Sequence, residues 1–249
     1  MKLKFILKIS IALMCCSIFM FNFIGCNKNE KGALEYLSNK YGQEFELDGN
    51  LTREGNDEFH PSPIKSTKAW PKNRSDEVFT IKLNSGDEFE DNYQNILMKS
   101  LADEYLINMI KSYWNNCKIC TELSGGFTDN KFSNDNILNF LVNSGVVSDI
   151  YIYSQYDNNF DIDKEGERIY KLYNEFVNRE LQGNIKIMYV MKDVLENEKI
   201  NASLWDEMES NNSFTKKYNI RYSKSYPEGN KEITIETIKE QLKNDMEKN

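Results

Sequence analysis

The chain has 249 residues, with 39 aspartate and glutamate residues against 31 lysine and arginine residues and a formal net charge of −8 at pH 7. An acidic surface repels phosphate groups, so nucleic acid and anionic lipid heads are poor partners, while cations, basic peptides and proteins are better ones. The length suits one folded domain or two.

The N-terminus has the layout of a secretory signal. Lys2, Lys4 and Lys8 make a basic start, and residues 9–24 are almost entirely apolar. This apolar run is shorter than the roughly 20 residues that a membrane-spanning helix needs. We therefore expect residues 1–25 to be a signal peptide. A plain cleaved signal without a lipid and an uncleaved anchor remain the alternatives.

The apolar run ends at Ile24-Gly25-Cys26, which resembles the lipobox of bacterial lipoproteins. Phe23 stands where that family usually has leucine. The resemblance implies that Cys26 receives a diacylglyceryl group and becomes the new N-terminus. Two acyl chains hold a protein lastingly on a bilayer, because each buried CH₂ group adds about 0.8 kcal/mol. The expected location is the extracytoplasmic face of the cell membrane, with residues 26–32 as a short lipidated tether.

The next residues predict one helix and two or three strands. Apolar residues at helical spacing predict a helix over residues 33–41, ended by glycine. Alternation of apolar and polar residues predicts strands over 45–47 and 79–83. The polar, proline-containing residues 52–76 predict a loop, with a short strand around 64–70.

A long amphipathic helix follows. Apolar and aromatic residues recur every four positions from Tyr93 to Tyr113, and Asp91 is the expected N-cap. A stripe of this kind is typical of a core face rather than of a ligand site. Residues 137–142 outline a short helix, which Gly145 closes.

The second half of the chain alternates between strands and helices. Residues 150–153 are apolar on both faces and predict a central strand. The pattern then predicts a helix over 169–181, strands over 185–191 and 217–222, and a last helix containing Ile235, Ile238 and Leu242.

These elements predict the α+β class, with antiparallel sheets covered by amphipathic helices, because no steady strand–helix repeat is present. A glycine-containing stretch, residues 124–131, is the expected break between two halves. The expected organisation is a signal peptide at 1–25, a tether at 26–32, an N-terminal half at 33–123 and a C-terminal half at 132–249.

The cysteine count leaves one pair for chemistry. Cys15 and Cys16 leave with the signal peptide and Cys26 carries lipid, so Cys117 and Cys120 remain. Their spacing is that of a redox pair, but a thioredoxin-like site needs a strand before the motif and a helix after it. Here a helix precedes the pair and a strand follows. Four interpretations of the pair stay open: a local disulfide, two spare thiols, two buried small residues, or a redox or metal site.

No catalytic motif is recognisable in the sequence. It contains no phosphate-binding glycine loop, no Gly-x-Ser-x-Gly elbow and no His-Glu-x-x-His helix, and its one histidine, His60, falls in the polar loop. We therefore predict no catalytic residue, no metal ligand and no cofactor.

One acidic stretch resembles part of a calcium loop. Counting from Asp161, acids occupy positions 1, 3 and 5, and Gly166 occupies position 6. However, Leu172 stands at position 12, where a bidentate glutamate is required. We therefore interpret the stretch as a helix N-terminus capped by its own acids. Weak calcium binding is the alternative.

Two segments resemble a group of uncharacterised small lipoproteins of Gram-positive bacteria. One is the Lys-Tyr-Gly-x-x-Phe stretch that runs from Lys40 to Phe45, and the other is Asp91-Asn92-Tyr93. The resemblance covers roughly residues 33–115 and implies no catalytic residues. We expect a membrane-anchored, non-catalytic binding or interaction module with a protein or peptide partner and no nucleic acid partner. An envelope enzyme, either a hydrolase or a thiol oxidoreductase, is the alternative, and a purely structural product is a third possibility.

Overall fold

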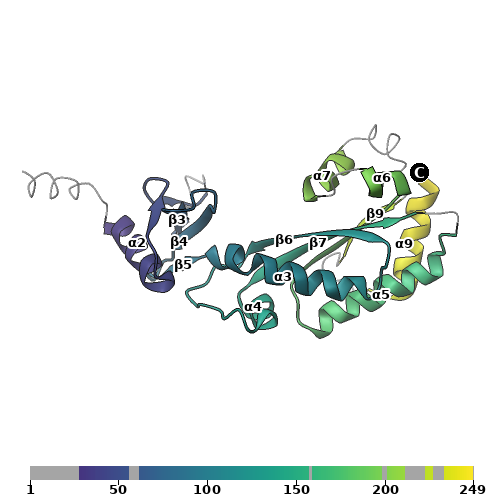
Figure 1. Cartoon of the computed structure of the whole chain (residues 1–249), viewed down its shortest axis with the longest axis horizontal. Coiled ribbons are helices and arrows are strands. Elements are labelled where there is room, and N and C mark those ends of the chain that lie inside the picture. Colours follow the sequence, from purple (N-terminus) through teal and green to yellow (C-terminus); the bar gives the residue numbers. More distant parts are fainter. Residues whose placement is uncertain are drawn as a thin grey trace, which may run out of the picture. The chain divides into compact units, whose positions relative to one another are not determined.

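The computed structural model describes residues 28–55, 62–156, 159–197, 201–210, 222–226 and 233–248. The expected signal peptide, Cys26 and His60 lie outside these residues. The chain forms two compact units, one ending at Asp91 and the other beginning at Asn92 (Figure 1). Among the described residues, no helix combines the length and the apolar composition that crossing a membrane requires.

The first unit consists of helix α2 and one antiparallel sheet. The sheet has the strand order β1-β3-β4-β5, and β2 pairs with β3 as well. The bounds are α2, Lys28–Tyr41; β1, Phe45–Leu47; β2, Thr52–Arg53; β3, Lys65–Pro71; β4, Phe79–Leu83; and β5, Phe89–Asp91. Ala33 and Leu37 of α2 are buried, as are Phe45 and Phe79, whose rings meet edge to face.

The alternating patterns predicted β1 and β4 to the residue, because every second side chain of β4 is buried. The short strand expected near residues 64–70 is β3. The helix α2 begins at Lys28, five residues before the predicted start at 33. Strands β2 and β5 were not predicted, because both residues of β2 are exposed and the buried residue of β5 is the polar Asp91.

The second unit contains a four-stranded sheet of order β6-β7-β8-β9. The bounds are α3, Tyr93–Lys111; β6, Cys117–Gly125; α4, Ile137–Asn143; β7, Val146–Gln155; α5, Ile162–Asn178; β8, Gly183–Val190; α6, Lys192–Asn197; α7, Ala202–Ser210; β9, Tyr222–Tyr226; and α9, Ile235–Lys248. The pairs β6–β7 and β8–β9 are antiparallel, whereas β7 and β8 are parallel and are joined by α5. A parallel pair needs such a crossover, because the chain must return to the starting edge of the sheet.

The prediction of an α+β fold with antiparallel sheets and several helices is confirmed. The parallel pair β7–β8 is the one departure from the expected antiparallel pairing among the described strands. The predicted strand at 217–222 lies outside the described residues except for Tyr222, which begins β9.

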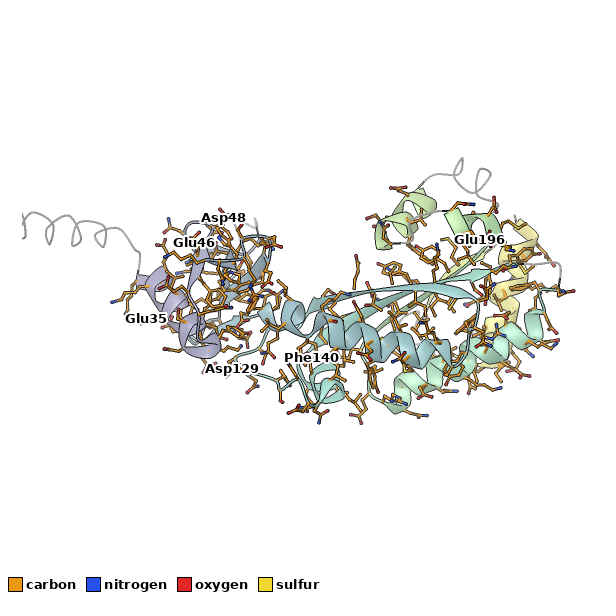
Figure 2. The ribbon with its side chains drawn as sticks, in the orientation of Figure 1. Glu35, Glu46, Asp48, Asp129, Phe140 and Glu196 are labelled. Atoms are coloured by element: carbon orange, nitrogen blue, oxygen red, sulfur yellow. The ribbon has the colours of Figure 1, made fainter. Side chains whose placement is uncertain are left out.

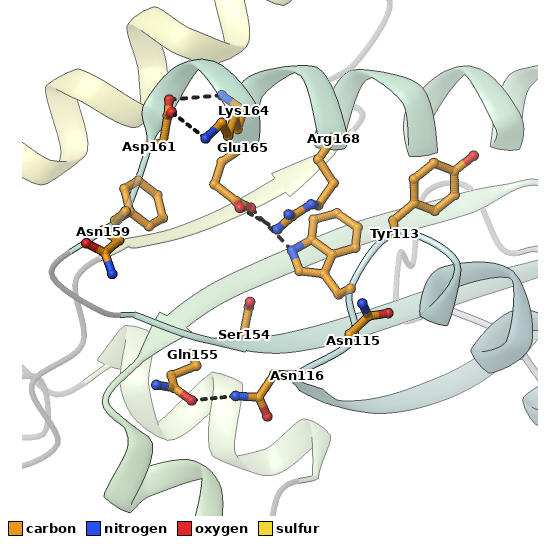
Figure 3. Close-up of a pocket in the computed structure, with 12 residues that line it drawn as sticks. Tyr113, Asn115, Asn116, Ser154, Gln155, Asn159, Asp161, Lys164, Glu165 and Arg168 are labelled. Atoms are coloured by element: carbon orange, nitrogen blue, oxygen red, sulfur yellow. Dashed lines mark hydrogen bonds and ion pairs between the residues drawn. The ribbon is translucent and has the colours of Figure 1, made fainter.

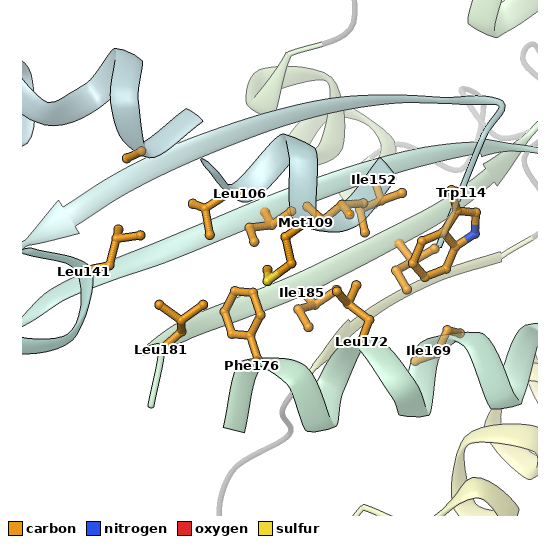
Figure 4. Close-up of a cluster of buried hydrophobic side chains, with 14 of the residues drawn as sticks. Leu106, Met109, Trp114, Leu141, Ile152, Ile169, Leu172, Phe176, Leu181 and Ile185 are labelled. Carbon is orange, nitrogen blue, oxygen red and sulfur yellow. The ribbon is translucent and has the colours of Figure 1, made fainter. Parts of the chain in front are cut away.

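Strand β7 is buried on both faces, as its continuous apolar run predicted. Ile150 and Ile152 belong to the larger core, which α3, α5 and α9 complete (Figure 4). Tyr151 and Tyr153 alternate with them and belong to a second core under α6 and α7 (Figure 1). Each large apolar side chain buried in this way stabilises the fold by about 1.5–3 kcal/mol.

Acidic side chains are exposed on both units. Glu35 and Glu46 on the first unit and Asp129 and Glu196 on the second are exposed, whereas Phe140 is fully buried (Figure 2).

The structure corrects the predicted division at residues 124–131. Strand β6 pairs with β7 at nine register positions, from Cys117 opposite Ser154 to Gly125 opposite Val146. These hydrogen bonds join the end of the predicted N-terminal half, 33–123, to the predicted C-terminal half, 132–249. The division between compact units falls at Asp91 and Asn92 instead.

The expected N-cap of α3 is also wrong. The N-cap is Asn92, whose side chain makes no capping hydrogen bond. Asp91 ends β5, and its fully buried carboxylate is bound by other side chains of the first unit.

Candidate functional site

A cavity of about 370 Å³ lies in the second unit at the carboxyl end of β7 (Figure 3). We call it the Trp114 cavity. It is lined by Tyr113, Trp114, Asn115, Asn116, Ser154, Gln155, Asn159, Phe160, Asp161, Lys164, Glu165 and Arg168. Its volume falls within the range of roughly 300–1,000 Å³ that is usual for small-molecule sites.

Strand pairing brings the walls of the cavity together. Cys117 pairs with Ser154, so the segment before β6 lies beside the end of β7. The chain then passes from β7 into α5, whose first turn supplies the remaining wall. The carboxyl ends of parallel strands and the N-terminus of the connecting helix are the usual place for a ligand in parallel sheets.

A buried carboxylate, that of Glu165, organises the cavity. Its Oε2 accepts hydrogen bonds from the Tyr189 hydroxyl at 2.7 Å and from the Trp114 indole N–H at 3.3 Å. Its Oε1 accepts a hydrogen bond from the Arg168 guanidinium and forms an ion pair with it. A buried charge is stable only when it is paired and hydrogen-bonded, and Glu165 meets both conditions.

The guanidinium of Arg168 is held from two sides. It pairs with Glu165, and its central carbon lies 5.4 Å from the centroid of the Trp114 ring, the geometry of a cation–π contact (Figure 3). Only Nη1 donates to Glu165, and no described residue accepts a hydrogen bond from Nε or Nη2. The side chain is 35% exposed and lines the cavity.

Asp161 is the N-cap of α5, as the sequence predicted. Its Oδ1 accepts hydrogen bonds from the backbone N–H groups of Asp163 at 3.0 Å and Lys164 at 3.2 Å. The Lys164 N–H is the main cause of the lowered pKa of Asp161. Asp163 forms an ion pair with Lys239 at 2.9 Å. Asp161 and Asp163, which belong to the stretch that resembles a calcium loop, therefore have partners within the protein: Asp161 caps α5 and Asp163 pairs with Lys239. The described residues contain no cluster of three or more potential metal ligands.

The remaining polar wall consists of carboxamides and one hydroxyl. The side-chain amide of Asn116 donates a hydrogen bond to Oε1 of Gln155, which orients both carboxamides (Figure 3). Asn115 and the hydroxyl of the buried Ser154 make no side-chain hydrogen bond to any described residue. These two side chains are available to a bound molecule.

The two remaining cysteines lie on opposite faces of β6. Residues three apart in a strand project to opposite sides of the sheet. Cys117 accordingly packs against the larger core and Cys120 against the second core, and both thiols are free. The disulfide alternative therefore does not hold in this structure.

Neither thiol has the electrostatic surroundings of a reactive cysteine. Burial raises the pKa of Cys117, and burial together with the neighbouring Glu122 raises the pKa of Cys120 to about 12. A reactive cysteine needs a lowered pKa, because the thiolate is the nucleophile. The structure gives no support to a thiol oxidoreductase.

The sequence prediction did not identify the Trp114 cavity, although one signal was present. Glu165 lies on the same stripe of α5 as the buried Ile169, Leu172 and Phe176. A charged residue in line with the apolar face of a helix must find partners inside the protein. That position marked Glu165 as unusual, but it did not reveal Trp114, Arg168 or Tyr189 as the partners.

Comparison with known proteins supplies little further information. No protein-family model and no curated protein matches the chain. A crystal structure of a DUF5037 family protein from Ruminococcus gnavus is similar over 85% of this chain and 97% of that one, with 13% sequence identity and a TM-score of 0.38. A similarity of that size supports no conclusion about function.

Proposed function

We propose that the chain is a lipid-anchored extracytoplasmic binding protein, and that the Trp114 cavity is its binding site. The observation that carries the proposal is the cavity itself, with a guanidinium fixed between Glu165 and Trp114. A binding site works best when its polar groups are already oriented before the ligand arrives, because less conformational freedom is then lost on binding.

The anchoring part of the proposal is supported by the N-terminal sequence. The basic start, the apolar run and the lipobox-like Ile24-Gly25-Cys26 agree with one another. Helix α2 begins at Lys28, so with Cys26 lipidated only Asn27 separates the lipid-bearing residue from the first helix. The first unit would then work close to the bilayer, as in the Gram-positive lipoproteins that the chain resembles.

Binding without catalysis fits the side chains of the cavity. The carboxylate of Glu165 accepts hydrogen bonds from three side chains, so it is poorly placed to take a proton from a substrate. The Ser154 hydroxyl lies in the cavity but has no hydrogen bond to a base among the described residues. Both features favour the binding module over the alternative of an envelope hydrolase.

The proposal is tested by photo-crosslinking in living cells. A photoreactive amino acid replaces Asn115, which is exposed at the cavity, in the full-length protein. The matched control carries the same group at Glu167, which is exposed on α5 but does not line the cavity. A Cys26→Ala version separates binding from membrane attachment.

We expect a reproducible small-molecule adduct at position 115 but not at position 167, and loss of the lipidated, membrane-bound form with Cys26→Ala. Equal labelling at both positions, or no labelling at position 115, would contradict the binding part. An unchanged membrane fraction with Cys26→Ala would contradict the anchoring part. If the crosslinked molecule is chemically altered and the protein turns it over, the enzyme alternative is favoured.

A further inference from the structure

We propose, resting on the function above, that the Trp114 cavity binds a short unblocked peptide, with the carboxylate of the peptide on Arg168. The inference deepens the proposed function, because it assigns a ligand class to the cavity. Four properties of the cavity carry it: the free donors of Arg168, the balance of charge, the occupied aromatic rings and the carboxamide wall.

The guanidinium of Arg168 has the geometry for a carboxylate. A guanidinium presents its donors in a planar fork that matches the two oxygens of a carboxylate. The Nη1 of Arg168 is used by Glu165, while Nε and Nη2 have no acceptor among the described residues. The Trp114 ring and Glu165 fix the plane of the fork, so little freedom is lost when a carboxylate binds.

The charges around the cavity are balanced. Arg168 and Lys164 are opposed by Glu165 and Asp161, and each cation forms an ion pair with one of these carboxylates. A dianionic phosphate would meet two carboxylates without a surplus of positive charge. A zwitterion introduces no net charge, and its ammonium group can approach the partly exposed Asp161 while its carboxylate binds Arg168.

The aromatic rings of the cavity already have partners, which disfavours a ligand that binds by stacking. The guanidinium of Arg168 covers one face of Trp114. The Phe160 ring meets Tyr189 edge to face at 4.7 Å and Tyr156 at 5.3 Å. A nucleobase gains much of its binding energy by stacking on an open aromatic face. The groups that remain available are polar.

The carboxamide wall complements a peptide group. A carboxamide presents a donor and an acceptor side by side, as a peptide bond does. Asn115 has no hydrogen bond to a described residue, and the Asn116–Gln155 pair still has unused donors and acceptors. The cavity of about 370 Å³ lies near the lower end of the usual range, which suits a ligand about the size of a dipeptide.

Isothermal calorimetry on the full-length protein in detergent micelles tests the inference. The probes are a panel of dipeptides with small and large side chains, each as the free acid and as its C-terminal amide. We expect at least one free dipeptide to bind. Its amide should bind at least about 10-fold more weakly, because the amide lacks the negative charge that Arg168 recognises.

A matched pair of variants localises the carboxylate. Arg168→Lys keeps the positive charge beside Glu165 but loses the planar fork, and we expect about 10-fold weaker binding of the free dipeptide. Arg179→Lys is the control. Arg179 is the C-cap of the same helix, pairs with Glu175 and lies 5.6 Å from the centroid of the Tyr105 ring, but it does not line the cavity. The control should bind as the unchanged protein does.

If no acid and amide pair differs in affinity, including the case in which none of them binds, the carboxylate inference is overturned. It is overturned equally if Arg168→Lys and Arg179→Lys bind alike. The proposed function can survive either result, since a small-molecule adduct at position 115 would still show a ligand of another class in the cavity. Loss of that adduct as well would remove both proposals.

Discussion

The ammonium group of Lys40 lies 2.8 Å from Oδ2 of Asp91, and both side chains are buried in the first unit. The hydroxyl groups of Tyr36 and Tyr41 also donate hydrogen bonds to the Asp91 carboxylate, at 2.9 and 2.7 Å. The Lys-Tyr-Gly-x-x-Phe segment that begins at Lys40 and the Asp-Asn-Tyr segment that begins at Asp91 therefore meet in one buried network. Their residue types are explained by the folding of this unit, and no catalytic role is needed.

Replacing Asp91 by asparagine should destabilise the first unit by about 3–5 kcal/mol, because Lys40 would keep a buried charge without its counterion. Hydrogen exchange resolved by peptide measures the effect on α2 and β4. The control is Glu44→Gln, which breaks the exposed ion pair with Lys72 and should leave exchange unchanged. Equal exchange in the two variants would show that the Lys40–Asp91 pair does not stabilise this unit.

Gly183→Ala should strongly destabilise the second unit. A Cβ atom at Gly183 would lie 1.9 Å from the carbonyl oxygen of Ser148, at the start of the parallel pairing of β7 and β8. Backbone atoms cannot move aside as a side chain can, so we expect a loss of about 3 kcal/mol or more. Gly86→Ala meets no atom within 4 Å and should be neutral. Thermal unfolding compares the two, and similar melting temperatures would refute the register of β7 and β8.

The decrease in the free energy of unfolding at alkaline pH should depend in part on Cys120. Its folded-state pKa is raised to about 12 from the ordinary 9.0, so the neutral thiol stabilises the fold below pH 9. That stabilisation is lost as the pH rises from 9 towards 12, because the unfolded chain releases the proton first. In Cys120→Ala the unfolding free energy should fall less steeply over this window. Parallel curves for the two proteins would count against a buried thiol at this position.

Glu165→Gln should destabilise the second unit by about 2 kcal/mol. The substitution removes the negative charge that balances Arg168, and the cost is below the ~3–5 kcal/mol of a fully buried pair because Arg168 is about one third exposed. Denaturant unfolding followed by circular dichroism measures it. If Glu165→Gln proves as stable as the unchanged protein, Glu165 does not organise the cavity.

Local patterns were sufficient for the elements that a single sheet or core face defines. Strand β4 alternates buried and partly exposed residues, and the apolar run in β7 predicted its burial on both faces. Strand β5 and the helices α6 and α7, which cover Tyr151 and Tyr153, show no clear periodicity of apolar residues. Their positions depend on contacts with distant residues.

The Trp114 cavity was not predictable from local patterns for the same reason. Its walls come from three segments, and the register that sets Cys117 opposite Ser154 brings two of them together. Asp91 shows a related limit. An aspartate shortly before a helix is a typical N-cap, but the buried Lys40 provides a stronger partner for this one.

The most direct test of the binding site uses the indole N–H resonance of Trp114 in an NMR titration of the full-length, ¹⁵N-labelled protein with the unblocked dipeptides. This N–H donates to Glu165 at the cavity wall, whereas Trp205 belongs to the second core on the other face of the sheet. Replacing each of these tryptophans by phenylalanine assigns the two resonances. Binding in the cavity predicts that the Trp114 resonance shifts while that of Trp205 stays in place. A dipeptide that shifts Trp205 alone, or a Trp114 resonance that no dipeptide moves, would contradict the account.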